Sequence, residues 1–132
     1  MTKQWDITSH PANLREVRKE LETFAKSIGM AEENSHAVGL VLNEALANII
    51  RHGYAGALDK PIRITAQTSD KELTIQIRDW AKPFDPTLIK ERYDAELKPG
   101  GLGLICIRRL MDHARFERLP DGMLLTLTKK MV

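Results

Sequence analysis

The sequence predicts an α+β fold, a two-layer α/β sandwich in which helices cover one face of a mixed, mostly antiparallel sheet. Two observations support this prediction. The expected elements follow the order strand, two helices, two strands, long irregular segment, helix, two strands. Each helix also has an apolar stripe that needs one sheet face to cover it. The chain of 132 residues has the length of one ordinary domain, so residues 1–132 are expected to form a single domain.

A short strand and an amphipathic helix are expected first. Residues 3–8 alternate enough to form a strand. Ser9 or Asn13 is expected to cap the helix that follows, and Pro11 suits its first turn. The helix is expected to end near Gly29. Its apolar stripe consists of Leu14, Val17, Leu21, Phe24 and Ile28.

A second helix is expected over residues 32–51, ended by Gly53, and it carries an unusual line of polar side chains. Glu44, Asn48 and His52 recur every fourth residue, so they lie along one side of the helix among apolar residues. A buried polar group without a partner costs about 1–3 kcal/mol. The line therefore indicates either a hydrogen-bonded core network or a ligand site, and this helix alone leaves both open.

Two β-hairpins are expected in the second half of the chain, with turns at residues 69–71 and 120–122. Their strands are residues 62–66, 73–79, 115–118 and 123–129. Between the hairpins, residues 80–101 are rich in proline and charge, with at most one short helix at 86–93. Loops this long are usually functional or mobile. A third helix is expected over residues 103–111.

Composition and charge exclude several classes of function. The net charge of +2 gives no reason to expect nucleic acid or membrane as a partner. Cys106 is the single cysteine, so no intramolecular disulfide can form, and its apolar neighbours indicate a small core residue. No apolar stretch reaches the roughly 18–20 residues of a membrane span, and the N-terminus lacks a signal-peptide apolar region. A cytoplasmic protein is the simplest interpretation.

Three segments of the chain combine residues suited to chemistry. Glu44 and Asn48 lie on the second helix, Asp79 ends an apolar strand, and a glycine cluster at 100–103 opens the third helix. Glycines let backbone amides approach a ligand closely, and a helix N-terminus favours phosphate. A Walker A motif, a Rossmann glycine motif after a strand and the H-R-D and D-F-G kinase motifs are all absent from the sequence.

Together and in this order, the three segments resemble the N, G1 and G2 boxes of the Bergerat-fold ATPases, which include gyrase, the mismatch-repair ATPases and histidine kinases. Within that superfamily the chain most resembles the anti-sigma-factor serine kinases of bacterial partner switching. The matching segments are residues 44–54, 79–86 and 100–112. The resemblance covers nearly the whole chain and implies a Bergerat ATP-binding fold that uses ATP and Mg²⁺.

The resemblance implies a role for each matching residue. Asn48 would bind Mg²⁺ through its amide oxygen, and Glu44 would be the general base for the substrate hydroxyl. Asp79 would accept a hydrogen bond from the exocyclic amino group of adenine. Lys98 would contact the γ-phosphate, and residues 80–99 would form a lid. The other implied nucleotide contacts are Ala81, Pro83, Phe84, Gly100, Gly101, Leu102, Gly103 and Leu104.

The chain departs from the wider superfamily at the adenine box. Ala81 and Pro83 replace both glycines of the D-x-G-x-G pattern, as is common in the serine-kinase branch, and make the loop stiffer. His52 is expected to be structural, and Trp80 is expected to pack the lid rather than stack near adenine.

The resemblance implies an ATP-dependent serine/threonine protein kinase that is also an anti-sigma factor. It would phosphorylate a serine of a STAS-domain anti-anti-sigma protein and bind a sigma factor or a similar regulator. Proteins of this branch are often homodimers. Two alternatives remain: a nucleotide-binding regulatory module without kinase activity, and a histidine-kinase-like ATPase domain.

Overall fold

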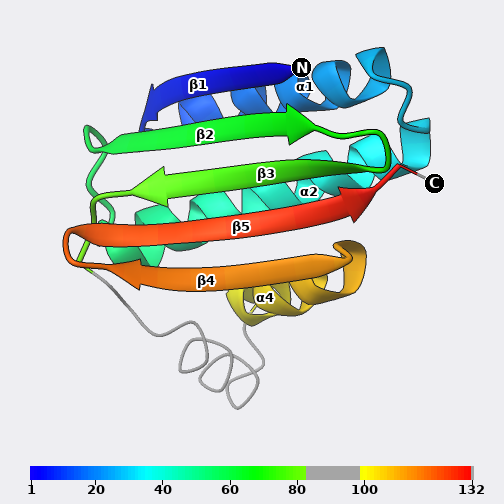
Figure 1. Ribbon diagram of the computed structural model, residues 1–132. Helices are drawn as coiled ribbons and strands as arrows, with labels where there is room; N and C mark the ends of the chain where they lie inside the picture. Colours follow the sequence, from blue (N-terminus) through cyan, green and yellow to red (C-terminus); the bar gives the residue numbers. More distant parts are fainter. Residues whose placement is uncertain (83–98, 132) are drawn as a thin grey trace.

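The computed structural model describes residues 1–82 and 99–131, with the main chain alone over 99–104 (Figure 1). The strands are β1 (Thr2–Thr8), β2 (Pro61–Thr68), β3 (Glu72–Asp79), β4 (His113–Leu119) and β5 (Gly122–Lys130). The helices are α1 (Ala12–Ser27), α2 (Glu32–Asn48), η1 (Ile49–Gly53), which continues α2, and α4 (Pro99–Leu110). This order confirms the predicted succession of elements, including both hairpins.

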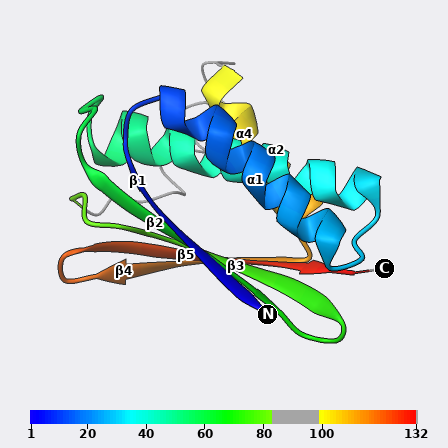
Figure 2. The same ribbon diagram turned by 90° about the horizontal axis from the view of Figure 1, so that it is seen from above.

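The five strands form one sheet in the order β1-β2-β3-β5-β4, and the helices lie on one face of it (Figure 2). Helix α2 lies between α1 and α4 and contacts both. The predicted two-layer α+β fold is therefore confirmed. Every strand pair in the described part of the chain is antiparallel, where a mixed sheet was expected. No helix in that part has the length and apolar character needed to cross a bilayer.

The core lies between the sheet and the helices, and strand alternation decides which residues enter it. On β3, Leu73, Ile75 and Ile77 are all fully buried on the helix side. Asp79 continues this series by two residues and is 1% exposed. The pleat therefore directs a carboxylate into the layer that apolar side chains otherwise fill.

The caps predicted for α1 are wrong. The Nδ1 atom of His10 accepts the amide hydrogen of Ala12 at 3.0 Å, and neither Ser9 nor Asn13 caps the helix. Ser9 is instead fully buried, and its hydroxyl donates to the main-chain oxygen of Ala57 at 2.5 Å. A contact with a distant turn has replaced the local cap, because it satisfies a buried hydroxyl.

Helix α2 changes its winding directly after Asn48. The η1 segment is a π-helical turn, and after it the amide of Tyr54 donates to the oxygen of Ile49 at 2.8 Å, five residues earlier. The tighter count of residues per turn expected for an α-helix therefore does not apply between Asn48 and Gly53. Gly53 ends the helical segment, as predicted.

Helix α4 begins at Pro99, four residues before the predicted start at 103, and ends at Leu110 rather than 111. Proline favours the first helical position, since its fixed φ suits the helix and its missing N–H would lack a partner there. The glycine cluster at 100–103 therefore lies in the first turn of α4. The short helix expected at 86–93 lies outside the described residues.

The tip of the β4–β5 hairpin lies against the end of β3. At Gly122, where φ is +156°, a Cβ atom would lie 2.0 Å from the main-chain oxygen of Asp79 and 2.8 Å from the Cα of Trp80. Real Cβ atoms do not approach other atoms this closely, so a side chain here must displace the end of β3. Only glycine therefore fits at this position.

Gly122→Ala is expected to lower the free energy of unfolding by about 3 kcal/mol or more, through overpacking added to backbone strain. Urea denaturation of both proteins measures the difference. Gly29→Ala is the matched control, because Gly29 also has positive φ (+98°) and its Cβ would meet open space. A cost at Gly122 no larger than the cost at Gly29 would contradict the close contact with Asp79.

Candidate functional site

A small cavity lies between α2, α4 and the sheet. Its volume is about 20 Å³, which holds about one water molecule. Seven lining residues are apolar, and the two polar ones are Asn48 and Asp79. The lining consists of Ala45, Asn48, Ile49, Ile77, Asp79, Ile107, Phe116, Met123 and Leu125. The structure thus brings together two predicted site residues that are 31 positions apart, since 79 − 48 = 31.

Asn48 is 8% exposed and lies at the last position of α2. Glu44 lies one turn earlier on the same side of the helix and is half-buried. It is not part of the cavity lining. Asn48 therefore presents an amide to the cavity, while Glu44 lies beside it toward α4.

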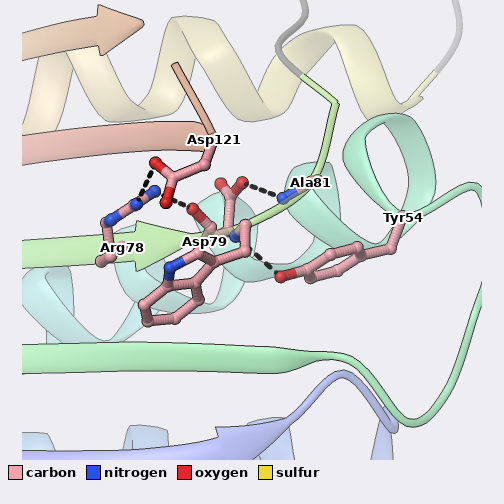
Figure 3. A network of polar contacts seen from close by, with 6 residues as sticks. Tyr54, Arg78, Asp79, Ala81 and Asp121 are labelled. Carbon is pink, nitrogen blue, oxygen red and sulfur yellow. Dashed lines mark hydrogen bonds and ion pairs between the residues drawn. The ribbon is translucent and has the colours of Figure 1, made fainter. Parts of the chain in front are cut away.

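Asp79 is held in place by its own strand end. Its Oδ1 atom accepts the amide hydrogen of Ala81 at 3.0 Å, and Ala81 is itself buried (Figure 3). Burial raises the pKa of the Asp79 carboxyl, and the Ala81 amide and the Arg78 guanidinium act in the opposite direction. A carboxylate has about four acceptor positions, so it can bind Ala81 and still accept a hydrogen bond from a ligand.

Cys106 is half-buried rather than a core residue, which corrects the prediction from its apolar neighbours. The next residue, Ile107, is the fully buried one. Burial raises the pKa of the Cys106 thiol, and the charge of Glu44 raises it further. The charge of Glu44 acts on Cys106 because α2 packs against α4.

Glu44→Gln is therefore expected to speed alkylation of Cys106 about two- to fivefold at neutral pH, because the thiolate is the reactive form and loses a repelling neighbour. The rate of iodoacetamide labelling, followed by mass spectrometry, measures this, and Cys106 is the only thiol in the chain. Glu33→Gln, on the exposed first turn of α2, is the control. Equal rates in all three proteins would contradict the proximity of Glu44 and Cys106.

The remaining predicted site residues lie on α4 or outside the described residues. Pro83, Phe84 and Lys98 belong to the segment that the structure does not describe. For five residues of α4 the structure describes the main chain alone: Gly100, Gly101, Leu102, Gly103 and Leu104. The first turn of a helix has amides without intrahelical partners, which suits it to an anion.

Three residues to which the sequence assigned no role lie around the end of β3 (Figure 3): Tyr54, Arg78 and Asp121. The hydroxyl of Tyr54 accepts the amide hydrogen of Trp80 at 2.9 Å, and Arg78 pairs with Asp121 at 2.6 Å. These contacts join residues 26 and 43 positions apart, so no local pattern could predict them. Trp80 stacks on Arg78 at 4.6 Å, is 38% exposed and does not line the cavity, while the lid that it was expected to pack belongs largely to residues outside the described part.

Known proteins resemble this chain over most of its length. Residues 7–129 match the model of the histidine kinase-like ATPase domain. The serine-protein kinase RsbW of Listeria innocua is 27% identical over 120 residues, which cover 85% of this chain and 76% of that protein. The anti-sigma F factor of Clostridium botulinum is 26% identical over 111 residues, covering 81% of this chain and 78% of that one.

A solved structure supports the same fold. The RsbU and RsbW domains of Rv1364c from Mycobacterium tuberculosis match with a TM-score of 0.72 at 20% identity, over 98% of this chain and 32% of that one. The family match covers most of the chain, and the five-stranded sheet with its helices on one face agrees with it. This chain belongs to the histidine kinase-like ATPase family.

Proposed function

We propose that this protein is an ATP- and Mg²⁺-dependent serine/threonine protein kinase that also acts as a cytoplasmic anti-sigma factor. One observation carries the proposal. Asn48 and Asp79 are the polar members of one apolar cavity, and Glu44 lies one helical turn from Asn48. Relatives named serine-protein kinase and anti-sigma F factor support the same assignment.

Asp79 would select adenine. Its carboxylate can only accept hydrogen bonds when ionised, and the exocyclic amino group of adenine is a donor. The apolar lining, with Ile77 and Met123 among it, suits the faces of a purine ring. The present cavity of about 20 Å³ is smaller than adenine. Adenine binding would therefore require lining side chains to move apart.

Asn48 would bind Mg²⁺. The described residues contain no group of three or more His, Cys, Asp or Glu side chains that could hold a metal ion. Mg²⁺ bound to a nucleotide does not need such a group, since it takes most of its ligands from phosphates and water. The ion, when bound, would neutralise charge on the phosphates. A buried amide at the cavity wall fits a single protein ligand.

Glu44 would receive the proton of the substrate serine. In the transfer, the serine oxygen forms a bond to the γ-phosphorus, the bond from that phosphorus to the ADP oxygen breaks, and the serine proton passes to Glu44. Glu44 is half-buried and lies outside the cavity lining, beside the polar residue that would hold the metal ion. Gly100, Gly101 and Gly103 in the first turn of α4 would contact the phosphates.

The protein substrate would be a STAS-domain anti-anti-sigma factor. Phosphorylation adds about −1.5 to −2 charges to the modified serine and would release that antagonist from the complex. A sigma factor or similar regulator would be the other partner, and a homodimer would be the assembly that binds them. Neither nucleic acid nor a membrane is part of this proposal.

Incubation of the protein with Mg-ATP and the STAS-domain protein encoded beside it tests the function. Acid-stable phosphoserine on the STAS protein, identified by mass spectrometry, is the expected result. A stable complex without any phosphoserine would instead indicate a nucleotide-binding regulatory module that has no kinase activity. Acid-labile phosphohistidine would instead indicate a histidine-kinase-like activity and overturn the serine-kinase assignment.

A further inference from the structure

The peptide bond between Asp79 and Trp80 is held on both sides by side chains. Its carbonyl oxygen accepts a hydrogen bond from the guanidinium of Arg78. Its N–H donates to the hydroxyl of Tyr54 at 2.9 Å (Figure 3). This peptide lies directly after the last residue of β3. Both of its polar groups are therefore fixed at the point where regular strand pairing ends.

Tyr54 connects this peptide to the helix that carries Asn48. It follows the last residue of η1, and its amide donates to the oxygen of Ile49, the residue after Asn48, at 2.8 Å. Its hydroxyl also donates to the main-chain oxygen of Pro61, at the start of β2, at 2.5 Å. One side chain thus joins the helix end, β2 and the end of β3.

Arg78 fixes the other side of the peptide. It pairs with Asp121 in the turn of the β4–β5 hairpin at 2.6 Å, and the ring of Trp80 lies 4.6 Å from its guanidinium carbon. Gly122 in the same hairpin leaves no room for a Cβ beside the Asp79 oxygen. The hairpin and Arg78 therefore restrain the Asp79–Trp80 peptide from one side, and Tyr54 restrains it from the other.

We propose that Tyr54 is a positioning residue for adenine recognition, because it fixes the main chain from which the Asp79 side chain projects into the cavity. This inference rests on the proposed function of Asp79. A ligand contact needs its side chain held within about 0.5 Å of the productive position. Tyr54 would also hold the adenine contact at a fixed position relative to Asn48, since it directly follows the helical segment that begins after Asn48.

Tyr54→Phe tests the proposal, since it keeps the ring and removes both hydroxyl hydrogen bonds. The measurement is equilibrium binding of ATP and of inosine triphosphate (ITP). ITP has a carbonyl oxygen where ATP has the amino group, so the affinity ratio of ATP to ITP reports on the Asp79 contact. The ratio is expected to fall about five- to tenfold, the effect of weakening one charge-assisted hydrogen bond. Affinity for ITP is expected to stay within about twofold.

Ser9→Ala is the matched control. The Ser9 hydroxyl binds the segment that connects η1 to β2, as Tyr54 does. It donates to the oxygen of Ala57 at 2.5 Å and accepts the amide hydrogen of Lys60 at 3.1 Å, and it does not contact Trp80. Its loss is expected to lower stability and leave the ATP to ITP ratio unchanged. A second variant, Arg78→Met, releases the opposite side of the peptide and is also expected to lower the ratio. If Tyr54→Phe does not fold, the affinity ratio of ATP to ITP in Arg78→Met tests the proposal in its place.

The outcomes separate this inference from the proposed function. If the unaltered protein prefers ATP to ITP and Tyr54→Phe has the same preference, the positioning role is overturned and the proposed function stands. If Ser9→Ala lowers the ratio as much as Tyr54→Phe, the effect is general loosening and the positioning role is again overturned. If the unaltered protein binds no ATP, the proposed function fails, and the inference fails with it.

Discussion

Glu44→Gln is expected to reduce serine phosphorylation by about 10²- to 10⁴-fold, the usual contribution of a general base. Glutamine has nearly the shape of glutamate and cannot take up the serine proton. Affinity for Mg-ATP is expected to stay unchanged, because Glu44 is absent from the cavity lining that contains Asn48 and Asp79. Phosphoserine formation under single-turnover conditions measures the first quantity, and equilibrium nucleotide binding measures the second.

Glu33→Gln, on the exposed first turn of the same helix, is the control for removal of one negative charge from α2. It is expected to leave both quantities unchanged. Full phosphorylation by Glu44→Gln would remove Glu44 as the base. Loss of Mg-ATP binding by the same variant would instead place Glu44 among the nucleotide contacts.

The sequence predicts those parts of the site that depend on local periodicity. Strand alternation through Leu73, Ile75 and Ile77 places Asp79 on the buried side, and it does lie there. Helical spacing places Glu44 and Asn48 on one side of α2. Both patterns repeat along a regular element, so the order of residue types in the sequence is enough to predict which side each residue faces.

The features that sequence reasoning missed depend on contacts between distant segments. The π-helical turn after Asn48 is one such feature, since no residue type at 49–53 predicts it. The hydroxyls of Ser9 and Tyr54 find partners 48 and 26 positions away. Such partners are fixed only when the elements pack, because buried polar groups take whatever acceptor or donor the fold supplies.

Asp79→Asn is expected to weaken ATP binding at least about tenfold and to favour ITP, since one charge-assisted hydrogen bond is lost and an amide can donate to the carbonyl of inosine. Asparagine keeps an oxygen for the amide of Ala81. Competition between ATP and ITP measures the change in preference. Asp70→Asn, at an exposed position of the β2–β3 turn, is the control and is expected to change neither affinity.

The same substitution is expected to raise the stability of the protein without nucleotide at neutral pH. Burial raises the pKa of Asp79 above its ordinary value of 3.8, so the folded state favours the protonated form. Below the unfolded pKa both states are protonated and the carboxyl costs nothing. As pH rises through the folded pKa, the charge forms in a buried place and stability is lost. The advantage of Asp79→Asn should therefore shrink as pH falls toward 3.8.

Stability and binding together decide what the buried carboxylate does. If both carboxylate oxygens belonged to a satisfied core network, Asp79→Asn would lower stability, because asparagine keeps one acceptor oxygen and puts a donor in place of the other. A carboxylate kept for a ligand carries a cost without the ligand, so its replacement raises stability while it weakens ATP binding. Urea denaturation at pH 7 distinguishes the two, and an Asp79→Asn protein less stable than the unaltered one would make Asp79 part of a core network. If Asp79→Asn is more stable than the unaltered protein and also binds ATP more weakly, Asp79 is the group that recognises adenine.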